Sequence, residues 1–163
     1  MKHKGETGVI IILPLLILGM LVFSARVMNV HYMTLNGFDQ AAKIYGQQFT
    51  VDRKTLDCKP GQTLSIYVTV KNTGNFIWPN AGSNPVHMSY HILDANKMSV
   101  INDGLRGILP KDLYPGQKVT MPLQMKAPEQ QGRYIVQVDM VQEGVAWFVE
   151  KSGEALNVNL ENG

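Results

Sequence analysis

An uncharged apolar run near the amino terminus constrains this chain more than any other feature. Val9 to Phe23 reads VIIILPLLILGMLVF, fifteen residues without a charge or a side-chain hydrogen-bonding group. Counted from Gly8 to Ala25 the run has eighteen residues, and a helix needs roughly 17 to 25 residues to cross a bilayer. Pro14 removes a backbone hydrogen bond, which spanning helices tolerate when neighbouring groups compensate. We therefore expect a transmembrane helix over residues 8–26.

The charges that flank this run predict its orientation. Lys2 and Lys4 precede it against the single acid Glu6, and Arg26 follows it. Because positive charge is enriched on the cytoplasmic side of spanning helices, residues 1–7 are expected in the cytoplasm. The predicted location is a membrane that the chain crosses once, with the C-terminal part of the chain outside the cytoplasm. The residues expected to anchor the chain in the membrane are Val9, Ile12, Pro14, Leu16, Met20 and Phe23.

Two other interpretations of the amino terminus stay open. One is a cleaved signal peptide, with a basic start, an apolar centre and the small residues Ser24 and Ala25 at its end. The other is a filament subunit, because Lys4-Gly5-Glu6 before an apolar helix resembles the start of pilin-like proteins. In the anchor and signal interpretations alike, the bulk of the chain lies outside the cytoplasm.

Residues 27–48 are expected to connect the anchor to a domain that occupies residues 49–163. Tyrosine and phenylalanine suit the headgroup region of a membrane, where a ring can be partly hydrated. Both a short helix from Phe38 to Tyr45 and a loosely ordered linker fit this pattern. The residues expected in the interfacial belt are Tyr32, Phe38 and Tyr45.

The charge balance outside the anchor limits the partners of the domain. Once Lys2, Lys4, Arg26 and Glu6 are set aside, 12 basic residues face 12 acidic ones. Nucleic acid requires a basic face, so the domain is predicted not to bind it. The single cysteine, Cys58, cannot form a disulfide within the chain and is expected to be a buried thiol.

From residue 49 onward, apolar and polar residues alternate in short runs, which predicts β-strands. Turn signals separate the runs, as is typical of an antiparallel sandwich. Pro122 inside one run indicates an edge strand or a bulge. Pro-Gly-Gln precedes two of the runs, and this pair suits a turn with a positive φ at glycine. The expected strands are Phe49–Val51, Leu64–Val70, Val86–Ile92, Lys118–Met125, Tyr134–Met140, Val145–Val149 and Ala155–Leu160.

One motif gives the sandwich a family resemblance. Gly132-Arg-Tyr134-Ile-Val136 resembles the Gly-x-Tyr-x-Cys entry to a strand of immunoglobulin-like domains, in which the tyrosine hydroxyl ties down the preceding corner. Val136 stands where the cysteine would be, so this chain looks like the disulfide-free kind. With Asn72-Thr-Gly74 and the segment from Asp139 to Phe148, residues 60–158 are similar to an immunoglobulin-like domain of bacteria. That domain is often appended to membrane glycosyltransferases or other cell-envelope proteins.

The resemblance implies a fold and an envelope location, but no reaction. Together with the expected anchor, it implies a protein of the bacterial inner membrane whose C-terminal domain lies in the periplasm. The expected fold is all-β: an immunoglobulin-like antiparallel sandwich of about seven strands, preceded by the transmembrane helix. Glycosyltransferase catalytic parts are not expected in this chain, and neither a nucleophile elbow nor a phosphate-binding glycine loop occurs in the sequence. We therefore expect a protein that is not an enzyme and that needs no cofactor.

Polar and aromatic residues supply the candidate contact site. An arginine can pair with a carboxylate and stack on an aromatic ring at once. One hypothesis is that Arg106 pairs with Asp139 or Glu143 across the sandwich and braces it. The other is that the aromatic rings of Trp78, Trp147 and Phe148 form an exposed contact surface for a sugar or a protein. The full candidate set is Trp78, Tyr90, Arg106, Asp139, Glu143, Trp147 and Phe148.

Two histidines invite comparison with a metal site. His87 and His91 would lie on one face of a strand about 13 Å apart, at about 3.3 Å per residue. A single zinc ion cannot bridge that distance, because its bonds to histidine nitrogens are only about 2 Å long. Both histidines are therefore expected to face solvent.

The predicted function is that of a non-catalytic accessory or scaffolding subunit in a larger bacterial membrane assembly. Its expected partners are the lipid bilayer and other membrane protein subunits. The first alternative is a carbohydrate-binding module of the cell envelope, which would add carbohydrate as a ligand. The second alternative is the pilin-like filament subunit.

Overall fold

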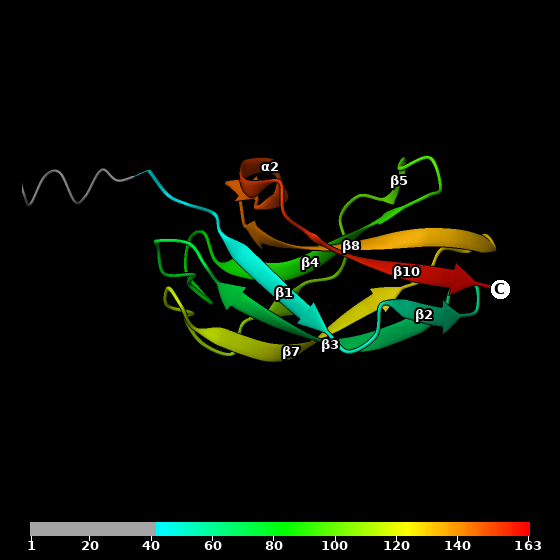
Figure 1. Ribbon diagram of the computed structural model, residues 1–163, viewed down its shortest axis with the longest axis horizontal. Coiled ribbons are helices and arrows are strands. Elements are labelled where there is room, and N and C mark those ends of the chain that lie inside the picture. The colour runs from blue at the N-terminus through cyan, green and yellow to red at the C-terminus, as the bar shows by residue number, and fades with distance from the viewer. Residues whose placement is uncertain (1–41) are drawn as a thin grey trace, which may run out of the picture. The chain divides into compact units, whose positions relative to one another are not determined.

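The computed structural model describes residues 42–163, which form an all-β sandwich of two sheets (Figure 1). Lys43–Gly163 makes one compact unit. The expected anchor over residues 8–26 lies outside the described residues, as do Tyr32 and Phe38 of the expected interfacial belt. Between residues 42 and 163, no helix is long and apolar enough to cross a membrane.

The sandwich consists of a smaller sheet A and a larger sheet B. Sheet A has the order β1–β3–β7, and sheet B has the order β2–β10–β8–β4–β5, with β6 paired to β4 and β9 paired to β8. The strands of sheet A are β1 (Gln47–Val51), β3 (Thr63–Asn72) and β7 (Lys118–Lys126). Those of sheet B are β2 (Thr55–Cys58), β4 (Val86–Leu93), β5 (Ser99–Ile101), β6 (Gly107–Ile108), β8 (Gly132–Gln142), β9 (Ala146–Trp147) and β10 (Leu156–Asn162). A short helix, α2 (Val149–Ser152), follows β9.

The chain changes sheets within its first two strands. β1 pairs with β3 in sheet A, and β2 then joins the edge of sheet B beside β10. The β2–β10 pair is parallel, whereas the sequence led us to expect a wholly antiparallel sandwich. Residues 47–58 therefore contribute one strand to each sheet.

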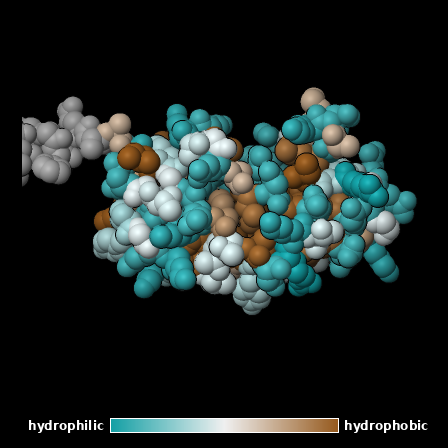
Figure 2. Space-filling model, in the orientation of Figure 1, coloured by the Kyte–Doolittle hydropathy of each residue, from teal (hydrophilic) through white to brown (hydrophobic). Residues whose placement is uncertain are grey.

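Alternation along the long strands builds the core. Inward-facing side chains of β3, β4, β7 and β8 are buried between the sheets, while their neighbours along each strand face outward. Fully burying one aliphatic side chain contributes about 1.5–3 kcal/mol. Figure 2 shows the result on the viewed face, where hydrophobic residues gather along the middle and hydrophilic residues cover most of the rest. The buried residues of these strands include Ile66, Val68, Val70, Val86, Met88, Ile92, Leu123, Met125, Val136, Val138 and Met140.

Six of the seven expected strands are confirmed, with ends that differ by a few residues. The seventh, Val145–Val149, is wrong in extent. Only Ala146 and Trp147 pair with β8, after which Phe148 turns into the core and α2 begins. All five residues of this run are apolar, so the pattern held no sign of the turn. β2, β5 and β6 were missed because they are short.

Turn chemistry agrees with the sequence at both Pro-Gly-Gln sites. Gly61 and Gly116 have φ values of 68° and 82°. In each turn the glutamine N–H donates to the carbonyl oxygen three residues earlier, Lys59 in the first and Tyr114 in the second, at 3.0 Å. Proline before a glycine with positive φ is the expected residue pair for such a turn.

The corner before β8 is also confirmed. The Tyr134 hydroxyl donates to the Gln130 carbonyl oxygen at 2.9 Å, as the immunoglobulin-like motif implied. The Asn162 amide donates to the carbonyl oxygens of Pro128 and Gln130 and so holds the same corner from β10.

Cys58 is buried, as expected, with 8% of the residue exposed. The pKa of its thiol is raised, chiefly by burial and further by the neighbouring charge of Asp57.

Candidate functional site

Three of the seven candidate residues belong to the hydrophobic core. Trp78, Tyr90 and Phe148 are 0%, 2% and 0% exposed. Their rings offer no surface to a ligand, so the structure corrects the hypothesis of an exposed aromatic surface that includes Trp78 and Phe148. The Tyr90 hydroxyl accepts a hydrogen bond from the Lys126 backbone N–H at 3.1 Å, which links the two sheets.

Two of the buried rings, those of Trp78 and Phe148, join the partly buried rings of Tyr45 and Phe76 in an aromatic cluster at the end of the sandwich where β1 begins. Phe148 meets Trp78 edge-on at 5.2 Å and Tyr45 edge-on at 4.9 Å between ring centroids, and Tyr45 meets Phe76 at 5.1 Å. Tyr45, which we expected in the interfacial belt, thus packs its ring onto the domain. Its hydroxyl donates to Gln142 Oε1 at 3.2 Å.

Asp139 is fully buried on the opposite side of β8 from the core, under the chain that follows β9. Its carboxylate accepts hydrogen bonds from the Met140 N–H at 2.8 Å and the Val149 N–H at 3.0 Å, and from the Gln47 side-chain amide. Burial raises the pKa of Asp139, although these hydrogen bonds and His91 act to lower it. Asp139 therefore does not pair with Arg106; it holds the start of α2 against β8.

Glu143 is the acid that pairs with Arg106. Arg106 Nε donates to Glu143 Oε1 at 2.5 Å, and the same oxygen lies 3.1 Å from His87 Nδ1. The pair lies on the outer face of sheet B and not across the sandwich, because Glu143 belongs to the turn after β8 and His87 to the neighbouring β4. Arg106 and Glu143 side chains are 27% and 31% exposed.

Other contacts fix the guanidinium group of Arg106 in place. Its Nη1 donates to Ser89 Oγ at 3.0 Å, to the Gly104 carbonyl oxygen at 2.8 Å and to the carboxylate of Asp103. The Arg106 hydrogen bond lowers the pKa of Glu143 below its ordinary value, against the opposing effect of burial, and His87 adds to the lowering. The guanidinium is thus held in one orientation before any partner binds.

Trp147 completes this group of side chains. Its ring centroid lies 4.1 Å from that of His91, and the Arg106 guanidinium carbon lies 5.4 Å from its ring centroid. Trp147 is half-buried, and His91 Nδ1 also bonds the Asn102 carbonyl oxygen. We name this group the Arg106 cluster; its members are His87, His91, Arg106, Glu143 and Trp147.

The cluster refines the expectation for the histidines. Both point away from the core, as predicted, but neighbouring side chains half-bury them. Through residues 42–163, no three His, Cys, Asp or Glu side chains gather as metal ligands do. The alternation of β4 predicted that His87 and His91 lie on the same side of the strand. Nothing in the sequence predicted the contact of His91 with Trp147.

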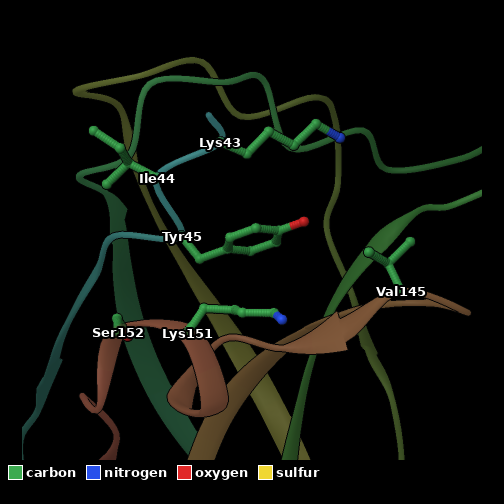
Figure 3. Close-up of a pocket in the computed structure, with 6 residues that line it drawn as sticks. All are labelled: Lys43, Ile44, Tyr45, Val145, Lys151 and Ser152. Atoms are coloured by element: carbon green, nitrogen blue, oxygen red, sulfur yellow. The ribbon is translucent and has the colours of Figure 1, made fainter. Parts of the chain in front are cut away.

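A pocket of about 620 Å³ lies at the end of the sandwich where the described chain enters. Figure 3 shows the Tyr45 ring between Lys43 and Lys151, with the three polar tips extending in one direction toward Val145. The Lys43 ammonium group also lies 5.0 Å from the Phe76 ring centroid. Sequence analysis missed this pocket, because Lys43 and Lys151 lie at opposite ends of the domain sequence. Its lining residues are Lys43, Ile44, Tyr45, Val145, Lys151 and Ser152.

Comparisons with known proteins identify no family for this chain. No family model matches it, and no curated protein does. Among solved structures, a β-glucosidase from Kluyveromyces marxianus is similar at 18% identity and a TM-score of 0.39, over 72% of this chain and 14% of that one. The ASH/PapD-like domain of human CEP192 (PapD-like domain 7) is similar at 13% identity and a TM-score of 0.28, over 76% of this chain and 89% of that one. The chain thus spans about a seventh of the β-glucosidase, and both similarities are distant.

Proposed function

We propose that this protein is a non-catalytic accessory subunit of a bacterial membrane assembly. In this proposal the apolar run Val9–Phe23 anchors the chain, and an immunoglobulin-like sandwich outside the cytoplasm contacts a partner protein. The tyrosine corner of Tyr134 supports the immunoglobulin-like assignment. The observation that carries the proposal is the Arg106 cluster, in which a half-buried tryptophan and a fixed arginine lie together on the outer face of a sheet.

The chemistry of the cluster suits a protein interface. Tryptophan and arginine dominate the residues that contribute most to binding between proteins, particularly where neighbouring groups exclude water. Arg106 is already held by Glu143 and Ser89, so a partner would lose little free energy in ordering it. Strand β4 supplies His87 and His91, which contact Glu143 and Trp147 and give the cluster a rigid base, and rigid elements keep the geometry of a site better than loops do.

The competing hypothesis is that the cluster only braces the fold. Bracing would account for the Arg106–Glu143 pair, since a partly buried ion pair with several hydrogen bonds stabilises the loops that carry it. It does not require the part of the half-buried Trp147 ring that stays accessible. The two hypotheses therefore differ most at Trp147, where the contact hypothesis predicts a loss of binding without a loss of stability.

The test uses the full chain in its native membranes. Trp147→Ala and Arg106→Gln are expressed in place of the wild-type chain, membranes are solubilised in mild detergent, and co-purifying proteins are quantified by mass spectrometry. Tyr67→Ala is the matched control, because Tyr67 is a 66% exposed aromatic residue on the outer face of sheet A. Melting temperatures are measured for all variants.

We expect a stoichiometric set of membrane proteins with the wild type and with Tyr67→Ala, and at least tenfold less with Trp147→Ala at an unchanged melting temperature. A partner set that survives Trp147→Ala would overturn the proposal at this site. A large fall in melting temperature would favour the brace instead. Purification of the chain alone, with Trp147-dependent retention on a polysaccharide column, would favour the carbohydrate-binding module.

A further inference from the structure

One end of the sandwich combines exposed apolar side chains with lysines. The described chain enters at this end, where β1 begins and β3 ends, while the C-terminus lies at the opposite end (Figure 1). Hydrogen bonds join the segments that form it: Thr73 N–H donates to the Gly46 carbonyl oxygen at 3.0 Å, and Gly116 N–H to that of Asn72 at 2.8 Å. We name this end the N-terminal face; its segments are residues 43–46, 73–78, 113–118 and 143–152, with Lys71 beside them.

Four large apolar or aromatic side chains are exposed on the N-terminal face. Ile44, Ile77, Tyr114 and Val145 are 59%, 43%, 51% and 52% exposed. None of the four belongs to the aromatic cluster. The core beneath them is closed by Trp78, which is fully buried. Burial of these four side chains would therefore require something outside the domain.

Four exposed lysines accompany them. Lys43 and Lys151 line the pocket, and no carboxylate shares that lining (Figure 3). Lys71 and Lys118 are directly opposite each other at the ends of β3 and β7, an arrangement that like charges disfavour. None of these four lysines forms an ion pair within the part of the chain that the structure describes. The acids of the same segments are Glu143, which pairs with Arg106, and the exposed Glu150, so the four lysines leave the face an excess of positive charge that a negatively charged surface would complement.

We propose that the N-terminal face rests on the anionic headgroups of a phospholipid bilayer. The inference depends on the proposed membrane anchor: the chain that leads into this face is preceded by the apolar run Val9–Phe23, so the face lies nearest along the chain to the anchored segment. Lysines would reach the phosphates, and Tyr114 and the aliphatic side chains would enter the boundary between headgroups and acyl chains.

The composition of the face favours lipid over a protein partner. The buried centres of protein interfaces are depleted in lysine. Surfaces that lie on membranes instead combine lysines with apolar side chains, because the long lysine stem places its charge among the headgroups while its carbons contact apolar groups. On the N-terminal face, the Tyr45 ring lies directly between two lysines.

The test places the full-length chain in lipid nanodiscs that contain phosphatidylglycerol. A fluorescent label is attached to single cysteines introduced by Ile44→Cys or Ile77→Cys in a Cys58→Ala background, and quenching is measured with spin-labelled lipids. Met98→Cys is the matched control, because Met98 is 66% exposed but lies in the loop before β5. We expect at least threefold stronger quenching at positions 44 and 77 than at position 98.

A second arm tests the charge. Each lysine near an anionic surface strengthens attachment about fivefold, so Lys43→Gln with Lys151→Gln should weaken docking about 25-fold. Quenching at position 77 should therefore fall in this double variant, and also for the wild-type sequence in nanodiscs of phosphatidylcholine alone. Lys97→Gln, a substitution in the loop before β5, should leave quenching unchanged.

The outcomes separate this inference from the proposed function. If alkaline carbonate extracts the chain from membranes, the anchor itself is wrong. If the chain stays in nanodiscs but labels at positions 44 and 77 are quenched no more than the label at position 98, the anchor stands and the lipid contact is wrong. Shielding of these labels only in native membranes, and not in pure lipid, would mean that a protein covers the face and would also overturn the proposal.

Discussion

The outer faces of the two sheets differ sharply, although both follow from the same alternation of side chains. On sheet A, the outward residues of β3 and β7 are small, polar or charged, and they remain open to solvent; Tyr67 is 66% exposed. On sheet B, the outward Ser89 and Asp139 are 0% exposed, and His87 and His91 are half-buried.

The cause is the chain that returns over sheet B. Arg106 and the loop before it cover Ser89, and the segment from β9 to α2 covers Asp139 through the Val149 N–H. Alternation thus decides which side of a sheet a residue occupies. Whether that side is exposed to solvent depends on the segments that follow the strands in the chain and pack over the sheet. Polar groups on sheet B must satisfy their hydrogen bonds within the protein, and those on sheet A can use water.

The strongest challenge to this comparison is Phe148→Ala. Phe148 is the point at which the covering segment enters the core, and truncation of a buried phenylalanine typically costs about 3–5 kcal/mol. We expect a loss of this size in the free energy of unfolding, measured by denaturant titration, against about 0.5 kcal/mol or less for Tyr67→Ala on sheet A. A loss below about 1 kcal/mol for Phe148→Ala would show that the segment is not held by this ring.

Asp139→Ala should have the next largest effect. It leaves the Val149 N–H without its side-chain acceptor and removes one of the two acceptors of the Gln47 amide, and an unmade hydrogen bond in a buried place costs about 1–3 kcal/mol. Relief of the buried charge offsets part of this, so we expect a net loss of about 2 kcal/mol. Thr120→Ala on sheet A is the control and should change stability by less than about 0.5 kcal/mol. Equal effects of the two substitutions would contradict the contrast between the faces.

Glu143→Gln tests the charged part of the cover through pH. The pKa of Glu143 is lowered from 4.5 in the folded protein, chiefly by the Arg106 hydrogen bond, so its carboxylate stabilises the fold above the unfolded value. That contribution disappears as the pH falls through the lowered folded pKa. The free energy of unfolding of the wild type should exceed that of Glu143→Gln by about 1 kcal/mol at pH 7. The two stabilities should converge in acid, and melting temperatures measured across this pH range would show the convergence.

The control for this pH dependence is Glu129→Gln. Glu129 forms an ion pair with Lys126 at 2.9 Å, but both side chains are more than half exposed. Exposed pairs contribute little, so its difference from wild type should stay within about 0.5 kcal/mol at every pH. A Glu143→Gln difference that persists unchanged into acid would mean that charge is not its source.

The smallest effect is expected on sheet A itself. Thr69 Oγ1 and Thr120 Oγ1 lie 2.7 Å apart on its outer face, the kind of cross-strand hydroxyl pair that contributes a few tenths of a kcal/mol. Thr69→Val keeps the β-branched shape and should cost about 0.5 kcal/mol or less. A double-mutant cycle with Thr120→Val should give a coupling energy within the same limit, because water can replace either partner.

Local patterns were sufficient to predict much of the fold. Alternation identified the inward side of β4 and β7, and the Gly-x-Tyr pattern identified the Tyr134 corner, because each depends on residues that are neighbours along the chain. The candidate site was harder. Nothing in the sequence distinguishes Asp139 from Glu143 as a partner for Arg106. The inward turn at Phe148 buries Asp139, and Glu143 is the acid that reaches Arg106.

Aromatic residues in loops were the least predictable. Trp78 lies outside the long strands, so no period marked it as buried; its bridge to Leu113 and its contact with Phe148 join segments that are distant in sequence. The pocket beside Tyr45 has the same origin, since Lys43 and Lys151 meet there only because β1 and α2 lie at one end of the sandwich.

The change of sheets between β1 and β2 has a mechanical consequence. β2 and β10 run in parallel, and they connect toward opposite ends of the domain (Figure 1). Tension applied between residue 43 and Gly163 would slide these strands along each other, so the rungs between them share the load and must rupture together instead of opening one at a time. Pulling single molecules from these two points should accordingly give a high rupture force that falls when a proline replaces Glu161, because the N–H of Glu161 faces β2, on the same side of β10 as the N–H groups of Asn159 and Gly163 that donate to Lys54 and Cys58.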